Sequence, residues 1–251
     1  MKKIFYFLSF SVLLLSCGGE DETPYDPDAI QSTTLLKKKV ETFDDGAPIT
    51  TTYHYNGFKI ANYTDNTGGS AVFTYSGNLI EKIEYFDETV LLRTDLFTYN
   101  AQNKVATHQA LLHPEDFGMR EVFTHNADGS ASYTTFFGTV AQQNTPDQPG
   151  KLFFANGEIV KKETYIGASP SFSETYQYDN WNNPLKNVIG LNQAYAFSGK
   201  IDGIQKVLLS TSGTTNPRAI TYQYDLYSRF PTSSSSISAL EGGVETQYVY
   251  E

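Results

Sequence analysis

The sequence predicts an all-β protein, an antiparallel up-and-down meander of repeated hairpins that curls into a barrel or half-barrel of roughly 14 to 17 strands. Tyr and Phe are abundant, at 18 and 17 residues, and aromatic side chains favour the pleated surface of a sheet. Segments of alternating apolar and polar residues recur between tight turns along most of the chain. Curling such a meander hides the strand edges that a long open sheet would expose.

The clearest unit is the stretch of residues 71–85. Apolar and polar residues alternate on both sides of a turn at Ser76, Gly77 and Asn78, which predicts a β-hairpin. Phe73 and Tyr75 lie two residues apart, so their side chains point to one face of the sheet immediately before the turn.

The same arrangement recurs as an aromatic residue, any residue, an aromatic residue or a substitute, and then a turn residue. The first position is aromatic in all eight copies and the second is Tyr in six of eight, with His125 and Ala155 as departures. The spacing varies from 20 to 46 residues, which favours a meander of hairpins over a solenoid of fixed period. The pairs are Tyr53/Tyr55, Phe73/Tyr75, Phe97/Tyr99, Phe123/His125, Phe153/Ala155, Tyr176/Tyr178, Tyr222/Tyr224 and Tyr248/Tyr250.

The first strands follow the same logic in chain order. Residues 33–43 and 49–55 form a pair around the Asp-Asp-Gly turn at 44–46. Asn-Gly at 56–57 then turns the chain into a strand at 58–63, and the glycines at 68 and 69 turn it again.

One long interval interrupts the rhythm between the sixth and seventh aromatic pairs. Within residues 184–217, Leu191–Phe197 is consistent with one or two helical turns and residues 203–209 with a strand. We interpret the interval as an insertion over one end of the sheet or as one extra hairpin. Decoration of the fold is favoured over a functional loop.

The N-terminus carries the features of a lipoprotein leader. Lysines at positions 2–3 precede an apolar run at 4–15, which is typical of a secretory signal peptide. The sequence ending in Ser16 and Cys17 resembles the lipobox of bacterial lipoproteins, which implies that the leader is residues 1–16 and that Cys17 carries the lipid. The alternative is an uncleaved anchor helix with an incidental cysteine. Two or three acyl chains would give stable membrane anchoring.

Residues 17–32 are predicted to form the lipidated cysteine and a flexible tether, with Pro24 and Pro27 in a short polar segment. Gly18, and not Asp, follows the cysteine, so the inner-membrane retention signal of enteric bacteria is absent. Residues 18–22 resemble the acidic export signal of Bacteroidota lipoproteins, although short acidic tethers also occur as simple linkers. The expected location is the outer membrane, on its periplasmic or cell-surface side.

The hairpins resemble a known repeat. Tyr-Gln-Tyr-Asp at 176–179 and again at 222–225 is similar to the YD (Rhs-type) repeat. Together with the lipobox and the Asn-rich segment at 182–187, the pattern resembles Bacteroidota lipoproteins built from such hairpins, over residues 33–251 as a single domain. About eight copies are too few for the toxin-enclosing cage of large Rhs proteins. The resemblance therefore implies a fold and a location but no activity.

Charge and motifs exclude several classes of function. Removal of the leader takes two lysines and leaves 16 basic against 28 acidic residues, a net charge of −12, which argues against a nucleic-acid partner. His108, His113, Glu115 and Asp116 could gather a metal ion, but their spacing matches no zinc motif and polar loop residues are the favoured interpretation. We find no nucleophile elbow or phosphate-binding loop, and expect no cofactor and no enzymatic activity.

The leading functional hypothesis is therefore a lipid-anchored outer-membrane lipoprotein with a structural or binding role and no catalysis, bound to the membrane through its lipid. The alternative is a glycan-binding lipoprotein of a nutrient uptake system; a protein partner also remains open. Exposed aromatic rings would favour the alternative, whereas rings packed inside the barrel would count against it, and burial is favoured. The candidate ligand-binding residues are Trp181, Tyr176, Tyr178, Tyr222 and Tyr224.

Overall fold

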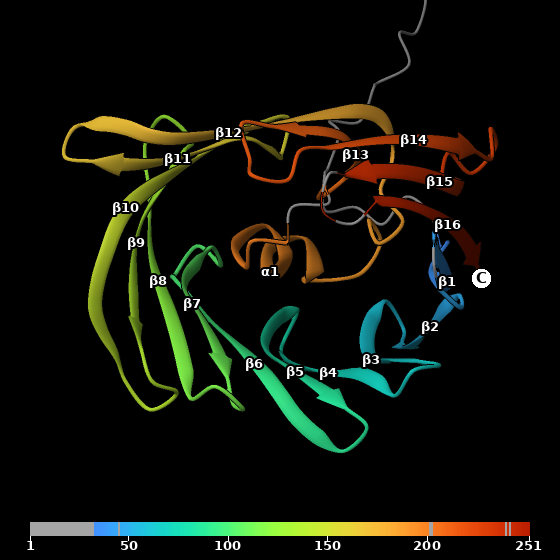
Figure 1. Cartoon of the computed structure of the whole chain (residues 1–251), viewed down its shortest axis with the longest axis horizontal. Coiled ribbons are helices and arrows are strands. Elements are labelled where there is room, and N and C mark those ends of the chain that lie inside the picture. Colours follow the sequence, from blue (N-terminus) through green and yellow to red (C-terminus); the bar gives the residue numbers. More distant parts are fainter. Residues whose placement is uncertain (1–32, 45, 201–202, 239, 241) are drawn as a thin grey trace, which may run out of the picture. The chain divides into compact units, whose positions relative to one another are not determined.

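The fold is a closed antiparallel barrel, as the sequence predicts. The computed structural model describes residues 33–44, 46–200, 203–238, 240 and 242–251, so the predicted leader, Cys17 and the tether lie outside the described residues. Within these residues sixteen strands follow one another in chain order, and β1 (Leu36–Phe43) pairs with β16 (Gly242–Tyr250) to close the ring (Figure 1). The sixteen strands lie within residues 33–251, the range predicted for a single hairpin-repeat domain, and that division of the chain stays a prediction.

Fourteen further strands in the described residues complete the ring. The seam between β13 and β14 is the thinnest, with one registered pair, Ser210 with Ala219. The strands are β2 (Ile49–Asn56), β3 (Lys59–Asp65), β4 (Gly69–Ser76), β5 (Leu79–Asp87), β6 (Val90–Tyr99), β7 (Val105–Leu112), β8 (Phe117–His125), β9 (Ala131–Gly138), β10 (Gln143–Ala155), β11 (Glu158–Ile166), β12 (Ser169–Asn182), β13 (Lys206–Ser212), β14 (Arg218–Tyr224) and β15 (Pro231–Ser238).

Seven of the eight aromatic pairs face the lumen, and the residues between them face outward. The fifth pair, Phe153/Ala155, is the exception and corrects the prediction, because Leu152 and Phe154 are the inward residues of β10 there and Ala155 is exposed. Phe73 and Tyr75 on β4 belong to the apolar cluster inside the barrel, whereas Thr74 between them is exposed. The same alternation leaves Gln177 exposed between Tyr176 and Tyr178 on β12. The predicted aromatic ladder is therefore mainly core, and its polar alternates form the outer wall.

The second member of most pairs joins neighbouring hairpins. Tyr99 donates a hydrogen bond of 2.7 Å to the backbone carbonyl of Ile80, nineteen residues earlier, at a point where the register of β4 and β5 shifts. Such a bulge disrupts the backbone ladder, and the hydroxyl satisfies the carbonyl there. Burial also raises the pKa of Tyr99, which keeps the hydroxyl protonated. Equivalent bonds run from Tyr55 to Leu36, from Tyr178 to Ile159, from Tyr250 to Pro231 and, through a ring nitrogen, from His125 to Val105.

The long interval between β12 and β13 folds into the lumen, and the expectation that it covers a sheet end or adds a hairpin is wrong. Its helix α1 (Leu191–Phe197) lies inside the ring of strands, against β5 and β7 (Figure 1). Burial of apolar side chains explains this position, because Leu191, Ala194 and Phe197 lie in the cluster formed by the inward-facing strand residues. Within the described part of the chain, no helix is long and apolar enough to cross a bilayer.

Two close contacts hold this insertion in place. Gly190 precedes α1 with φ of 77°, and a Cβ there would lie 2.5 Å from the carbonyl oxygen of Asn78, so only glycine fits. At the other end, the buried Glu158 carboxylate accepts hydrogen bonds from the backbone N–H groups of Ile204, Gln205 and Lys206 at 2.6–2.7 Å. This anchoring explains why the strand predicted at 203–209 instead begins at Lys206.

Candidate functional site

The lumen contains a cavity on the side opposite the packed helix. Its volume is about 370 Å³, which lies at the lower end of the range for small-molecule sites. The walls come from β1, β2, β14, β15 and β16, and Asn183 to Leu185 of the insertion complete it. We call it the lumen chamber. Its lining residues are Leu36, Lys39, Glu41, Phe43, Tyr53, Asn183, Pro184, Leu185, Arg218, Ile220, Tyr222, Ser234, Ser236, Val244, Thr246 and Tyr248.

The chamber exists because β15 and β16 present small hydroxyl side chains to the lumen. Where β4 and β5 place Phe73, Ile80 and Ile83 inward, β15 places Ser234 and Ser236 inward. The alternation that turns these serines inward is the same one that fills the lumen elsewhere. Short hydroxyl side chains in place of large apolar ones leave open, polar space.

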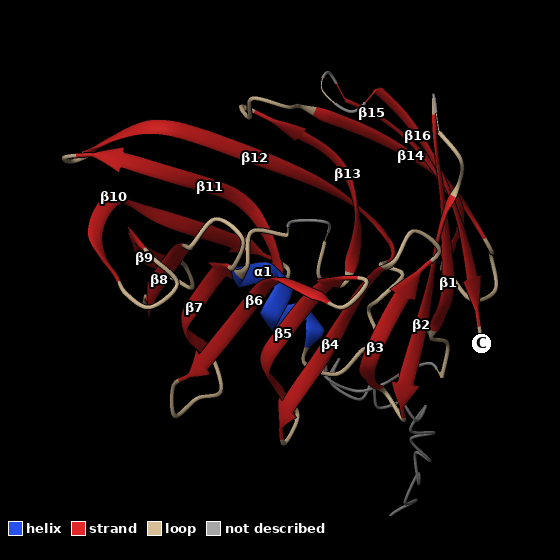
Figure 2. Ribbon diagram, turned by 60° about the horizontal axis from the view of Figure 1, so that its bottom comes forward, coloured by secondary structure: helices blue, strands red, loops and turns tan. Residues whose placement is uncertain are grey.

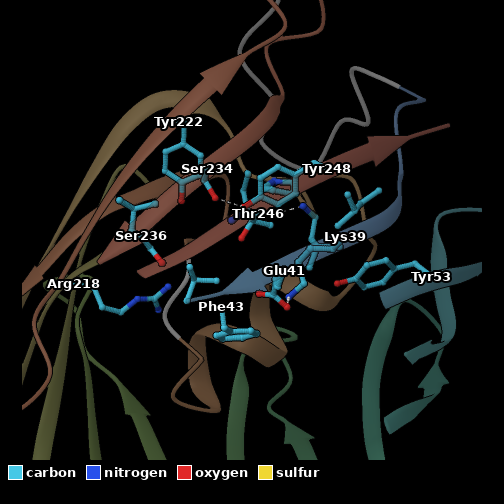
Figure 3. A pocket seen from close by; sticks show the side chains of 16 residues that line it. Lys39, Glu41, Phe43, Tyr53, Arg218, Tyr222, Ser234, Ser236, Thr246 and Tyr248 are labelled. Atoms are coloured by element: carbon cyan, nitrogen blue, oxygen red, sulfur yellow. Dashed lines mark hydrogen bonds and ion pairs between the residues drawn. The ribbon is translucent and has the colours of Figure 1, made fainter. Parts of the chain in front are cut away.

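The chamber combines aromatic faces with hydroxyl groups. Tyr53, Tyr222 and Tyr248 stand around the cavity, and the hydroxyls of Ser234 and Tyr248 lie 2.9 Å apart (Figure 3). Tyr and Ser hydroxyls both donate and accept hydrogen bonds. Such a surface suits a ligand that has both apolar faces and hydroxyl groups.

Charged side chains lie on two sides of the chamber. Lys39 and Glu41 on β1 form an ion pair with Nζ and Oε2 2.8 Å apart, and Arg218 faces them from β14 (Figure 3). The lining therefore carries two cations and one carboxylate, and the carboxylate is already paired. The chamber offers fixed charges for orienting a polar ligand.

The lumen also contains a cluster of polar side chains around His108, and these side chains form hydrogen bonds and ion pairs with one another. His108 is fully buried, with Nε2 3.2 Å from Asp95 Oδ1 and Nδ1 3.3 Å from Glu121 Oε2, and its ring stacks on Phe97. Arg93 pairs with the same Asp95 oxygen at 2.7 Å.

These contacts set the charges of the group. Burial opposes the charged forms, but the bonds from His108 and Arg93 lower the pKa of Asp95, and the two carboxylates raise the pKa of His108. Since each ring nitrogen of His108 faces a carboxylate, neither is left to accept a proton from a nucleophile. The group is suited to holding β6, β7 and β8 together rather than to general-base chemistry.

The four residues considered as possible metal ligands do not converge, and the interpretation of all four as polar loop residues is wrong for His108, which is buried on β7. His108 lies in the buried group above, whereas His113 Nε2 is 2.9 Å from the Thr94 hydroxyl and Asp116 accepts a hydrogen bond from the backbone of Val140. No group of three potential metal-ligand side chains occurs among the residues that the structure describes.

The structure brings three of the five candidate ligand-binding residues together. The Trp181 ring stacks on Tyr224 at 4.5 Å between centroids, and Tyr224 stacks in turn on Tyr222 at 5.8 Å, so a column of rings leads to the chamber wall. Tyr176 and Tyr178 lie elsewhere, bonded to Glu174 and to the Ile159 carbonyl. Only Tyr222 lines the chamber, and Cys17 is outside the described residues.

Sequence reasoning missed the residues that make the chamber. Ser234, Ser236 and Thr246 carry no motif, but one signal was available. The stretch Pro231–Ser238 is a strand with four consecutive serines and no large apolar residue at its lumen-facing positions 234 and 236. A strand of that kind in a barrel with an apolar lumen predicts a cavity beside it.

The fold and this lumen define a class: a closed barrel with a mainly polar outer wall, one packed side and one open chamber. No family model matches the sequence, and no curated protein matches it either. Among solved structures the chain is similar to a porin-like protein from Bacteroides vulgatus, with 15% identity and a TM-score of 0.54, over 87% of this chain and 99% of that one. A porin-like protein from Bacteroides uniformis gives 12% identity and a TM-score of 0.51, over 86% and 98%. At these identities the likeness shows the fold alone.

Proposed function

We propose that this protein is an outer-membrane lipoprotein, anchored through acylated Cys17 after removal of residues 1–16, whose barrel binds a small polar ligand and performs no catalysis. The observation that carries the binding role is the lumen chamber, which is open and lined by tyrosine rings and hydroxyls inside an otherwise packed barrel. The lipobox-like sequence at Cys17 supports the anchor, and the similarity in fold to porin-like proteins supports the envelope location. The resemblance of the hairpins to YD repeats is part of the same proposal.

The polarity of the outer wall favours a barrel that is surrounded by water and connected to the membrane by its tether. Barrels that span a membrane carry an outward apolar band about 25 Å tall. Here most outward positions between the aromatic pairs are polar and exposed, namely Thr74, Thr98, Thr124, Gln177 and Gln223, whereas the exposed apolar residues Val72, Ile237 and Val249 lie on three different strands, β4, β15 and β16. We therefore carry over the fold of the porin-like proteins but not a pore through a bilayer.

Carbohydrate is the second, narrower candidate for the ligand. A sugar ring has one face of C–H groups and a rim of hydroxyls, and the chamber offers tyrosine faces beside Ser234, Ser236 and Thr246. This differs from the exposed aromatic rings that the glycan-binding alternative required at the sequence level, because Tyr176 is buried and Trp181 stacks on Tyr224. Glycan capture would then occur inside the barrel.

Binding can be tested with a matched pair of serine variants on one strand. Ser236 lines the chamber, whereas its neighbour Ser235 faces the opposite side of the sheet. We expect full-length Ser236→Leu to lose binding to its best ligand from a glycan array by at least tenfold, and Ser235→Leu to retain it. Equal binding by the two variants would remove the chamber as the site.

Anchoring is tested separately. Full-length Cys17→Ser should leave the membrane fraction and should not incorporate a radiolabelled fatty acid. Persistence of the variant in the outer membrane would contradict the lipoprotein proposal without affecting the chamber.

A further inference from the structure

The described chain enters and leaves the barrel at one rim. Leu35 and Glu251 exchange backbone hydrogen bonds of 3.1 and 3.0 Å beside the start of β1 and the end of β16. Because consecutive strands are antiparallel, the same rim carries the turn between β14 and β15 and the start of β13. We call it the tether rim, since the predicted tether precedes Leu35 in the chain; Figure 2 marks the C-terminus, which follows β16 at this rim.

Three cations gather on the tether rim. Lys206 Nζ and Arg229 Nη2 both donate to the Asn180 carbonyl, at 2.9 and 3.3 Å, and Lys186 Nζ donates to Asn182 Oδ1 at 3.1 Å. Burial lowers the pKa of Lys186, and the positive charges of Lys206 and Arg229 lower it further, because nearby like charges disfavour the charged form. No carboxylate of the described residues forms an ion pair with any of them.

Two acidic side chains close to these cations are engaged in turns, and two others at this rim, Asp128 and Glu251, pair with Lys151 and Lys37. Asp225 accepts hydrogen bonds from the Tyr227 backbone and the Ser228 hydroxyl, and Asp179 accepts one from the Trp181 backbone at 2.7 Å. The opposite rim has the reverse character. Among the described residues its turns and adjoining strand ends carry one cation, Arg218 at the start of β14, against six acidic residues, Asp44, Asp65, Asp87, Glu88, Glu115 and Asp116.

An apolar tip stands beside the three cations. Leu226 and Tyr227, in the turn between β14 and β15, are 75% and 99% exposed. The turn is firmly held, because Arg229 N–H donates to the Asp225 carbonyl at 2.9 Å and Asp225 N–H to the Phe230 carbonyl at 3.0 Å. Aromatic and aliphatic side chains beside Lys and Arg are the composition of surfaces that bind the membrane interface.

We propose that the tether rim rests on an anionic lipid surface, with Leu226 and Tyr227 in the headgroup region and Lys186, Lys206 and Arg229 against headgroup phosphates. The inference rests on the proposed anchor at Cys17, which brings this rim to the bilayer. The acidic opposite rim then faces away from the anionic surface. Replacing all three cations should weaken the contact between the tether rim and anionic vesicles about a hundredfold and reduce its salt dependence, while the lipid anchor keeps the protein on the vesicle.

The test uses full-length lipidated protein in vesicles. Cys17 is the only cysteine of the chain, so when acylated it leaves no free thiol, and one introduced cysteine can carry an environment-sensitive fluorophore. We expect the probe at Tyr227→Cys to shift to the blue and resist aqueous dithionite on vesicles with about one third phosphatidylglycerol. It should stay accessible on pure phosphatidylcholine. The control, Glu88→Cys on the opposite rim, should stay accessible on both.

A triple variant separates the rim from the anchor. In the Tyr227→Cys background, Lys186→Gln, Lys206→Gln and Arg229→Gln together should abolish protection of the probe while flotation with vesicles persists. A probe at position 227 that is equally accessible on both vesicle types, in protein that floats, overturns the inference and leaves the anchor intact. Protein that floats with neither vesicle counts against both.

Discussion

The two sides of the lumen are built from the same type of hairpin, but one side is packed and the other contains a cavity. On the packed side, β4 to β8 turn large apolar residues inward, and α1 fills the remaining space with Leu191 and Phe197. On the open side, β14 to β16 keep their aromatic pairs but place Ser234, Ser236 and Thr246 between them, and a cavity of about 370 Å³ remains. Both sides therefore share the aromatic pairs, and the other inward-facing side chains determine whether the lumen is packed or contains a cavity.

The largest expected difference between the two sides is the cost of losing a ring. Phe197 contacts Phe123 at 4.9 Å and Phe154 at 6.0 Å between centroids, so Phe197→Ala leaves a cavity in packed surroundings and should cost about 3–5 kcal/mol in free energy of unfolding. Phe43 on the open side is half-buried at the chamber wall, and Phe43→Ala should cost about 1 kcal/mol. Urea unfolding measures both, and equal losses would erase the distinction.

Buried ions provide a second contrast, and it depends on pH. The raised pKa of His108 means that its contribution to stability is complete below its unfolded value of about 6.5 and is lost as pH rises through the folded value. The lowered pKa of Asp95 means that its contribution is complete above about 3.9 and is lost as pH falls. Together with Arg93 and Glu121, the group should stabilise the packed side most between about pH 4 and 6.5.

Removing the imidazole tests this window. His108→Gln should cost about 3 kcal/mol near pH 5, because Asp95 and Glu121 lose their shared partner, and the loss should shrink toward pH 9. The control is His54→Gln on the exposed outer face of β2, which should change neither stability nor its pH profile. A pH-independent loss in His108→Gln would show that packing, and not charge, is what the ring contributes.

Sequence reasoning succeeded where a local pattern determines structure. Alternation and turn residues around Ser76–Leu79 and its counterparts predicted the meander, the inward aromatics and the polar wall, since each depends on neighbours two to four residues apart. The location of α1 depends on space enclosed by strands far away in the chain, so the 184–217 interval was wrongly interpreted as covering a sheet end. The hydrogen bonds from the second tyrosine of a pair to a backbone carbonyl could have been predicted from the sequence, because the second position is Tyr in six copies and Phe in none.

Filling space should have opposite effects on the two sides. Ala194 on α1 is fully buried, so Ala194→Leu forces neighbouring side chains apart and should cost about 1–3 kcal/mol in free energy of unfolding. Ser236→Leu adds a larger side chain where the chamber has room, and should leave stability unchanged within about 0.5 kcal/mol. Thermal unfolding of both variants decides the matter; a large loss in Ser236→Leu would mean that the chamber cannot accept the added volume.

The smallest expected effect concerns single hydroxyl groups. Tyr99→Phe leaves the carbonyl of buried Ile80 without its 2.7 Å hydrogen bond, and should cost about 1–2 kcal/mol, since no solvent replaces the donor in the packed side. Tyr248→Phe also removes one hydroxyl bond, to Ser234, but both groups line the chamber, where a water molecule can take over the contact. We expect a loss of at most about 0.5 kcal/mol there. Equal losses measured by urea unfolding would indicate that water does not enter the chamber, and a dry chamber would favour an apolar ligand over a hydroxyl-rich one.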